Sequence, residues 1–184
     1  MKKVYVLLFS IMFFASCQKN KTAEQQSEIS QTDSNSKVDA ISSVASRVDS
    51  AEIAKKWLVD KIEDAFKNNM GEYDKFCTKK YAEYKSDATG VGMDGGMDEN
   101  AFKKKWKKEY DTKYSGMGIG FMINAQDWNT IKVTEVKLKN NLENGGYFFK
   151  IVVEDIEAKA KYNRDVKVIR SGNTFLIDDV LEYN

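Results

Sequence analysis

Hydrophobic residues recur at helical spacing from Ser50 onward. Ser50 belongs to a residue type that commonly caps helix N-termini, and Gly71 follows the first periodic stretch as a C-terminal stop. A second predicted helix covers 72–85, and a third starts near Asp98, which serves as its N-cap. The apolar faces of these helices are Ile53, Trp57, Leu58, Ile62, Ala65 and Phe66; Tyr73, Phe76, Cys77, Tyr81 and Tyr84; and Phe102, Trp106 and Tyr110.

Beyond residue 114 the apolar period falls to two, which is typical of β-strands. Four strands are predicted at 130–140, 146–156, 162–170 and 174–182, with hairpin turns at 144–146 and 171–173. Ile131 and Val133 share one parity, whereas Val136 and Leu138 share the other, which predicts a β-bulge near 134–135. The predicted fold class is therefore α+β, with N-terminal helices packed on a strongly bent antiparallel β-sheet meander.

The first residues indicate a secretory signal peptide, because Lys2 and Lys3 precede an apolar run over 4–14 that is too short to span a bilayer. Phe14-Ala15-Ser16-Cys17 resembles a bacterial lipobox, although Phe14 replaces the usual aliphatic residue. The resemblance implies that Cys17 becomes an acylated N-terminus and that its acyl chains anchor the protein in a membrane. An ordinary signal peptide with an incidental cysteine is the alternative.

Residues 18–48 are rich in Ser, Gln, Asn, Lys and Asp and contain no aromatic residue, which predicts a disordered tether. The predicted organisation is a lipoprotein signal peptide over 1–16, the lipidated cysteine and tether over 17–48, and a globular domain over 49–184. Gln18, not Asp, follows Cys17. We therefore expect a cell-envelope location at the outer membrane, on its periplasmic or its surface face.

Composition excludes several function classes. The 29 basic and 28 acidic residues nearly balance, which gives no reason to expect a nucleic-acid partner. The chain contains no histidine, which excludes Ser-His-Asp and Cys-His catalysis and His-ligated metals. A literal G-x-G-x-x-G over 90–95 follows a predicted helix and not a strand, so it lacks the context of a dinucleotide site. We expect neither a metal nor a cofactor.

The order of two or three helices and then a bent meander resembles the nuclear-transport-factor-2-like superfamily, also called SnoaL-like or cystatin-like. The ending Phe175-Leu176-Ile177-Asp178-Asp179-Val180 looks like the last strand of uncharacterised lipoprotein families with that fold. The resemblance covers about 50–184 and implies a curved sheet that wraps a long helix and leaves a conical pocket. The superfamily contains isomerases, dehydratases and transport adaptors, and a homodimer is plausible by analogy.

Three alternate glycines, Gly116, Gly118 and Gly120, are the most unusual motif. No Gly-Lys-Ser/Thr follows them, so they do not form a phosphate loop. An extended backbone would place all three on one face, which is either closely packed by another element or forms the floor of a pocket. With them, Trp57, Tyr84 and Trp128 are the candidate ligand-binding residues.

Asp178 and Asp179 are the candidate catalytic acids, together with Tyr81. They should point to opposite faces of the last strand, and a carboxyl group in an apolar pocket could act as a general base. The alternative is a carboxylate that is paired with lysine or solvated at the strand end. Cys77 lies on an apolar helix face without a histidine to activate it, which predicts a buried, inert thiol.

The third helix carries a lysine-rich face that surrounds Trp106. Lys103, Lys104, Lys107 and Lys108 are the candidate membrane-facing residues, and a simple solvated face is the alternative. The sequence as a whole predicts a lipid-anchored binding domain, not an enzyme, that takes a small apolar ligand or a protein partner at its concave sheet. The alternatives are a His-free isomerase- or dehydratase-like enzyme and a structural envelope component.

Overall fold

The computed structural model describes residues 35–68, 70–125 and 127–183, and the side chains of 50–68, 72–125 and 127–183. Its helices are α1 (Asn35–Lys67), α2 (Lys79–Gly90) and α3 (Glu99–Trp106), with two 3-10 helices, η1 (Met70–Phe76) and η2 (Thr112–Tyr114). Its strands are β1 (Ile131–Asn141), β2 (Tyr147–Asp155), β3 (Ala160–Ser171) and β4 (Thr174–Glu182). Helices followed by one antiparallel sheet confirm the α+β class.

The four strands form a simple meander in the order β1-β2-β3-β4, so β1 and β4 are the two edges of the sheet. The register shifts between Val133 and Glu135, which confirms the predicted bulge in the first strand. The register of β1 shifts again between Leu138 and Asn140. A further bulge lies in β4, because Ile177 pairs with Val168 whereas Asp179 pairs with Lys167, so the extra residue is Asp178.

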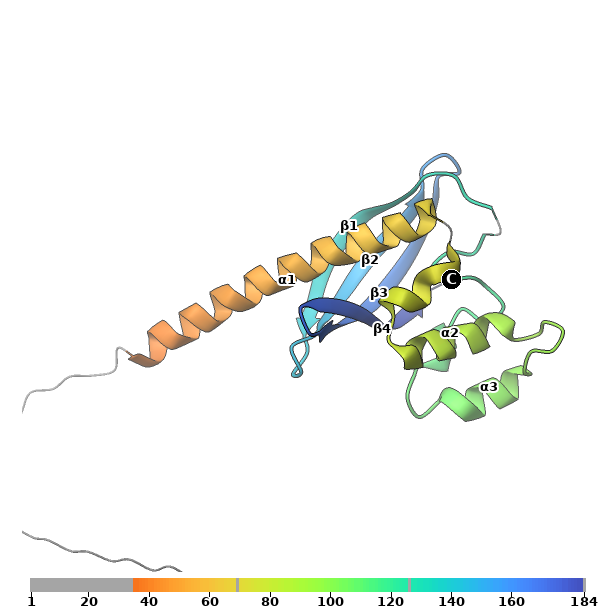
Figure 1. Cartoon of the computed structure of the whole chain (residues 1–184), viewed down its shortest axis with the longest axis horizontal. Coiled ribbons are helices and arrows are strands. Elements are labelled where there is room, and N and C mark those ends of the chain that lie inside the picture. The colour runs from red at the N-terminus through yellow and green to blue at the C-terminus, as the bar shows by residue number, and fades with distance from the viewer. Residues whose placement is uncertain (1–34, 69, 126, 184) are drawn as a thin grey trace, which may run out of the picture.

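α1 lies across one face of the sheet, whereas α2 and α3 lie beyond β4 (Figure 1). The face of α1 that meets the sheet buries Ala54, Leu58 and Ile62 completely. Opposite them, the inward-facing residues of the strands form the other half of the core. These residues are Phe149, Ile151, Val153, Val166, Val168, Ile177 and Val180. The strand alternation that the sequence predicts therefore carries the sheet half of the core.

The first predicted helix begins in the wrong place. α1 starts at Asn35, inside the stretch predicted to be a tether, so Ser50 is an internal helical residue and not an N-cap. The spacing of Val38, Ile41 and Val44 continues the apolar period, and no Gly or Pro interrupts 35–67. Residues 18–34 of the predicted tether, and Cys17, lie outside the described residues.

The second predicted helix is also wrong over 72–78. α1 ends at Lys67, Gly71 falls within η1, and Glu72 has a non-helical backbone conformation at φ −120° and ψ 20°. Cys77 then pairs with Ile177 as an isolated parallel bridge, which takes the chain out of helical geometry. Thr78 restarts the helix as N-cap, because its Oγ1 accepts a hydrogen bond from the Tyr81 backbone N–H at 3.2 Å.

The third predicted helix has the expected start. Asp98 is the N-cap of α3, and its carboxylate accepts a hydrogen bond from the Ala101 N–H at 2.9 Å. Phe102 and Trp106 are buried as their spacing predicts. Tyr110 lies beyond the end of the helix, where its ring stacks on Tyr84 at 4.2 Å between centroids.

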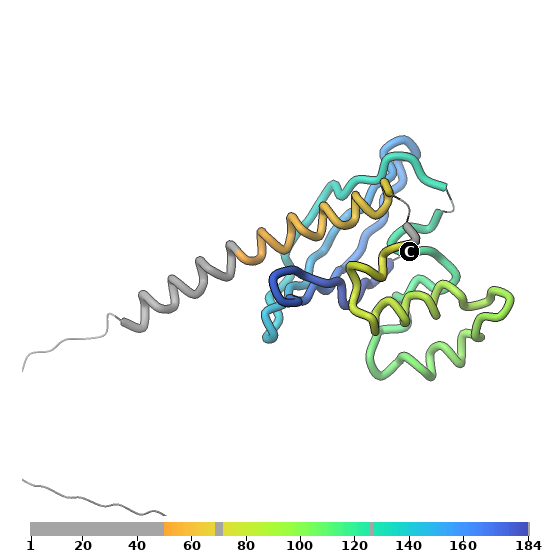
Figure 2. Tube along the Cα trace, in the orientation of Figure 1, coloured from red at the N-terminus to blue at the C-terminus, as the bar shows by residue number. Residues whose placement is uncertain are grey.

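The segment from η2 to β1 returns from the α2–α3 pair to the sheet and passes beside the end of β4 (Figure 2). Ring contact between Tyr114 and Tyr183, at 4.8 Å between centroids, holds one end of this passage. A hydrogen bond from the Met122 N–H to Glu182 holds its middle. The segment therefore covers the end of the sheet at which β4 finishes.

Candidate functional site

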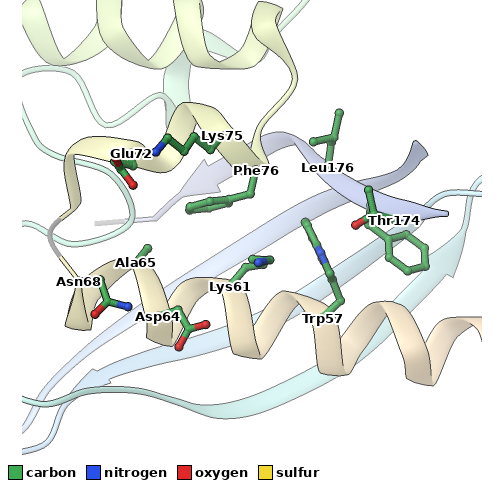
Figure 3. Close-up of a pocket in the computed structure, with 11 residues that line it drawn as sticks. Trp57, Lys61, Asp64, Ala65, Asn68, Glu72, Lys75, Phe76, Thr174 and Leu176 are labelled. Atoms are coloured by element: carbon green, nitrogen blue, oxygen red, sulfur yellow. Dashed lines mark hydrogen bonds and ion pairs between the residues drawn. The ribbon is translucent and has the colours of Figure 1, made fainter. Parts of the chain in front are cut away.

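A groove of about 370 Å³ opens between α1, η1 and the beginning of β4 (Figure 3). We call it the Trp57 groove. It is lined by Trp57, Lys61, Asp64, Ala65 and Asn68 from the α1 side, Glu72, Lys75 and Phe76 from η1, and Thr174, Phe175 and Leu176 from β4. Three elements thus contribute to one hollow at the edge of the sheet.

The apolar part of the groove is built on contacts with the core. The Trp57 ring lies 5.7 Å from the Phe175 ring, centroid to centroid, and Phe175 in turn contacts Tyr147 at 6.2 Å. Phe76 reaches into the same hollow from η1 (Figure 3). Trp57 and Phe76 are both half-buried, so each ring is held on one side and open on the other. An aromatic ring that packs on the protein with one face and leaves the other face open can stack against an apolar group of a ligand.

The rim of the groove carries both signs of charge. Lys75 and Glu72 pair with each other, with Nζ and Oε1 2.6 Å apart. Lys61 and Asp64 are exposed on α1, one turn apart, and neither forms an ion pair within the described part of the chain. A ligand that carries a carboxylate and an ammonium group could pair with both of these residues.

The floor of the groove includes a free stretch of strand edge. Farther along β4, the Ile177 carbonyl accepts a hydrogen bond from the Thr78 N–H at 2.8 Å, so the backbone of Ile177 points away from β3. Because these directions alternate along a strand, the N–H and C=O of Phe175 also point away from β3. Within the described residues, Ile177 is bridged to Cys77 at this edge, and no such bridge involves Phe175, which lines the groove.

The three alternate glycines do not lie on one face of a strand, and that prediction is wrong. Their segment forms turns and bends, and Gly116 and Gly118 have positive φ angles of 61° and 72°. A Cβ at Gly116 would lie 2.1 Å from Glu182 Oε2 and 2.9 Å from Lys85 Nζ. A Cβ at Gly118 or Gly120 would meet nothing closer than 3.7 Å. The glycines thus have separate roles, and Gly116 accommodates a buried ion pair.

That ion pair joins Lys85 of α2 to Glu182 of β4, with Nζ and Oε1 2.7 Å apart and both side chains fully enclosed. Lys85 also donates to the carbonyl of Ser115 at 3.1 Å. Burial raises the pKa of Glu182 and lowers the pKa of Lys85, and the pairing opposes both shifts. The charges are enclosed in the core, where mutual pairing offsets part of their loss of hydration.

Arg164 completes this cluster from β3. Its Nε donates to the Met122 carbonyl at 2.7 Å, while the Met122 N–H donates to Glu182 at 3.3 Å. Met122 has a φ of 65°, which is strained for a residue other than glycine. The Glu182 Oε2 and the Tyr81 hydroxyl are buried without a hydrogen-bond partner in the described residues. Arg164 and Glu182 therefore hold the strained backbone at Met122 in place.

Sequence inspection did not single out Lys85, Arg164 or Glu182. Two signals were available: Lys85 continues the helical spacing of Tyr81, Tyr84 and Ala88, and Glu182 shares the inward parity of Val180. A charge at an apolar position indicates a buried partner. The identity of that partner depends on how α2 packs beside β4.

The structure separates the candidate catalytic residues from one another. Asp178 pairs with Lys167 at 2.8 Å and accepts a hydrogen bond from Thr78 Oγ1 at 3.1 Å, which matches the lysine-paired alternative. Asp179 is half-buried, and burial raises its pKa to about 6. Tyr81 is fully buried, and burial raises the pKa of its hydroxyl far above the ordinary value. None of these three residues lines the Trp57 groove.

The remaining ligand candidates are divided between other regions. Tyr84 is enclosed by aromatic neighbours, with Phe102 at 5.5 Å and Tyr110 at 4.2 Å between ring centroids. Trp128 donates from its Nε1 to the Phe66 carbonyl at 3.1 Å. Trp128 and Gly120 line a separate apolar hollow of about 240 Å³. Of the predicted ligand-binding residues, Trp57 alone lines the Trp57 groove.

The lysine-rich helix is partly neutralised. Lys103 pairs with Glu99, and Lys105 pairs with Glu83 and Asp87 at 2.7 and 2.8 Å. Three other lysines are exposed and form no ion pair within the described part of the chain: Lys104, Lys107 and Lys108. The cationic face is therefore smaller than the sequence suggests.

The thiol of Cys77 is buried, with 4% of the residue exposed, and burial raises its pKa. It is therefore protonated and shielded at neutral pH, as the sequence predicts for an inert thiol.

No described helix is both long enough and apolar enough to cross a bilayer. Comparison with protein-family models, with curated proteins and with solved structures returned no match to this chain.

Proposed function

We propose that this chain is a lipid-anchored protein of the cell envelope whose globular domain binds a ligand in the Trp57 groove without transforming it. Anchoring through acyl chains on Cys17, at the outer membrane, is proposed from the lipobox-like sequence. A nuclear-transport-factor-2-like fold is proposed from the element order. The exposed lysines of α3 are proposed as a secondary contact with anionic lipid.

The observation that carries the binding proposal is the composition of the groove. Its volume of about 370 Å³ lies in the range of ligand sites, and Trp57 and Phe76 offer apolar ring surface. Lys61 and Asp64 supply charged groups that have no ion-pair partner in the described residues. Apolar walls with a few convergent polar groups are the usual make-up of a small-molecule or peptide site.

Acid–base catalysis is the second candidate, and one observation favours it. Asp179 has a pKa raised to about 6, which suits a general base near neutral pH. Burial raises the pKa values of Tyr84 and Tyr110, and the charge of Asp179 adds to the increase at both phenols. Asp179 does not line the Trp57 groove, however, so the ring-lined hollow and the titrating acid are separate features.

Native mass spectrometry tests the binding proposal directly. The full chain is purified in detergent from its own host, beside Trp57→Ala and Phe76→Ala variants. Leu138→Ala is the control, because Leu138 is an apolar residue of β1, at the opposite edge of the sheet, that is 44% exposed. We expect a co-purifying species on the wild type and the control that both groove variants lose.

A species that all four proteins retain equally would overturn the proposal, as would a wild-type chain that carries and binds nothing. Thermal unfolding is measured in parallel, because Trp57 contacts the core through Phe175. A groove variant that has lost its fold is replaced by Lys61→Glu, which changes only an exposed rim charge.

A further inference from the structure

The outer edge of β4 is paired with another segment at Ile177 and unpaired at Phe175 within the described residues. Cys77 and Thr78 pair with β4 at Ile177, where the Thr78 N–H donates to the Ile177 carbonyl at 2.8 Å. Two residues earlier, the N–H and C=O of Phe175 point outward from the same edge, beside the Trp57 groove. The chain itself thus shows that this edge accepts a paired extended segment.

The geometry points to an extended peptide as the occupant of the Trp57 groove, paired with β4 through the backbone N–H and C=O of Phe175. This inference rests on the proposed function and names the class of its ligand. An added strand beside Phe175 continues the line of pairing that Cys77 begins at Ile177. Main-chain hydrogen bonds then supply affinity, and neighbouring side-chain contacts supply specificity.

The walls of the groove match a peptide in other respects. Trp57 from α1 and Phe76 from η1 both face the hollow, so an apolar side chain of the added strand can lie between their rings (Figure 3). Lys61 and Asp64 stand one helical turn apart on the rim without ion pairs in the described residues. A peptide with an acidic residue and a basic residue beside its apolar one complements both charges.

The free edge is short, which selects a peptide over a second copy of the chain. It extends over Thr174–Leu176, because Cys77 and Thr78 already occupy the edge at Ile177. Pairing between two such short edges would form few hydrogen bonds, and short edge strands are a known device against edge-to-edge association. A flexible peptide can instead adapt to the groove that lies between α1 and η1.

The test begins with a displayed library of random heptapeptides selected on the full chain in detergent. The enriched peptides are synthesised with and without methylation of single backbone nitrogens, and the central apolar residue is varied to alanine. We expect binding that weakens at least tenfold on methylation of one backbone N–H and on Trp57→Ala. Leu138→Ala, at the other edge of the sheet, should bind as the wild type does.

Hydrogen exchange locates the contact on the protein. On peptide binding, the Phe175 amide should become protected, whereas the Leu176 amide should change little because it already faces β3. Enriched peptides that bind regardless of N-methylation, or that leave Phe175 unprotected, would overturn the inference.

A parallel titration with the dye 1-anilinonaphthalene-8-sulfonate distinguishes failure of the peptide inference from failure of the proposed binding function. If the library yields no binder but the dye binds the wild type and not Trp57→Ala, the peptide inference fails and the groove remains a binding site. If neither probe distinguishes wild type from Trp57→Ala, both the inference and the proposed function fail.

Discussion

Lys85 Nζ and Glu182 Oε1 lie 2.7 Å apart in a fully enclosed ion pair. Lys56 and Asp60 form an exposed pair at the same 2.7 Å distance on α1. The two pairs differ in burial: the side chains of the first are 1% and 0% exposed, and those of the second are 78% and 53% exposed. Comparing substitutions in the two pairs therefore measures how burial changes the contribution of an ion pair to stability.

Removing one partner of the buried pair should destabilise the fold strongly. Lys85→Met or Glu182→Leu leaves an unpaired charge in the core, so each is expected to lower the free energy of unfolding by about 3–5 kcal/mol. The double variant should cost less than the sum of the two. Lys56→Met should change stability by less than about 1 kcal/mol, because the exposed pair is well solvated.

Urea denaturation of the four variants measures these differences. Equal, small effects at both sites would show that the enclosed pair is open to water in solution, which contradicts the packing of α2 against β4.

The three alternate glycines should respond to alanine in a graded series. Gly116→Ala combines a positive φ with a Cβ that would lie 2.1 Å from Glu182 Oε2, and it is expected to cost about 2–4 kcal/mol. Gly118→Ala has room but a φ of 72°, for which about 1 kcal/mol is expected. Gly120→Ala should stay within about 0.5 kcal/mol, because its nearest neighbour would lie 3.8 Å away.

Thermal and urea unfolding rank the series. Equal effects at all three glycines would instead favour the strand face that the sequence first suggests.

Asp179 should make stability depend on pH. Burial raises its folded pKa from 3.8 to about 6, so the folded chain holds this proton more tightly than the unfolded chain does. Its contribution to stability is therefore largest below pH 3.8 and is lost as the pH rises through about 6. Asp179→Asn removes this loss and should gain stability relative to wild type, by up to about 3 kcal/mol, over that interval.

Urea unfolding of both proteins at several pH values gives the difference curve. A constant difference between pH 3.5 and 7.5 would show that Asp179 titrates normally in the folded chain.

Several elements could be predicted from the sequence, because their signals are local. β4 occupies the predicted 174–182, since a glycine turn precedes it and Phe175 and Ile177 begin an alternation of side chains. The parity switch after Val133 reveals the first bulge directly. Asp98 is recognisable as an N-cap because its spacing to the first apolar helix residues is fixed by local geometry.

Other features depend on contacts between distant segments. The helix predicted over 72–85 is broken at Cys77, because β4 pairs with that residue at Ile177. Gly116 is required by Glu182, and the spacing of the glycines alone does not reveal it. Trp57 could be selected as a ligand candidate, but Phe76 and Lys61 join it only through the packing of η1 and α1 against β4.

The proposed anchor makes an independent prediction. Cys17→Ser removes the thiol that would carry the acyl chains, so the variant should lose covalently bound lipid and move from the membrane pellet to the soluble fraction. Intact-protein mass spectrometry and fractionation follow both changes. A variant that keeps the wild-type mass increment, or that still sediments with membranes, would show that Cys17 is not the anchor.

The most direct test of ligand binding in the Trp57 groove uses fluorine NMR of the full chain labelled with 5-fluorotryptophan. The three tryptophans give three resonances, which single Trp→Phe substitutions assign. On addition of an envelope extract from its own host, the resonance of Trp57 should shift while those of Trp106 and Trp128 remain in place. A Trp57 resonance that does not move, or that moves no more than the Trp106 and Trp128 resonances, would contradict the account.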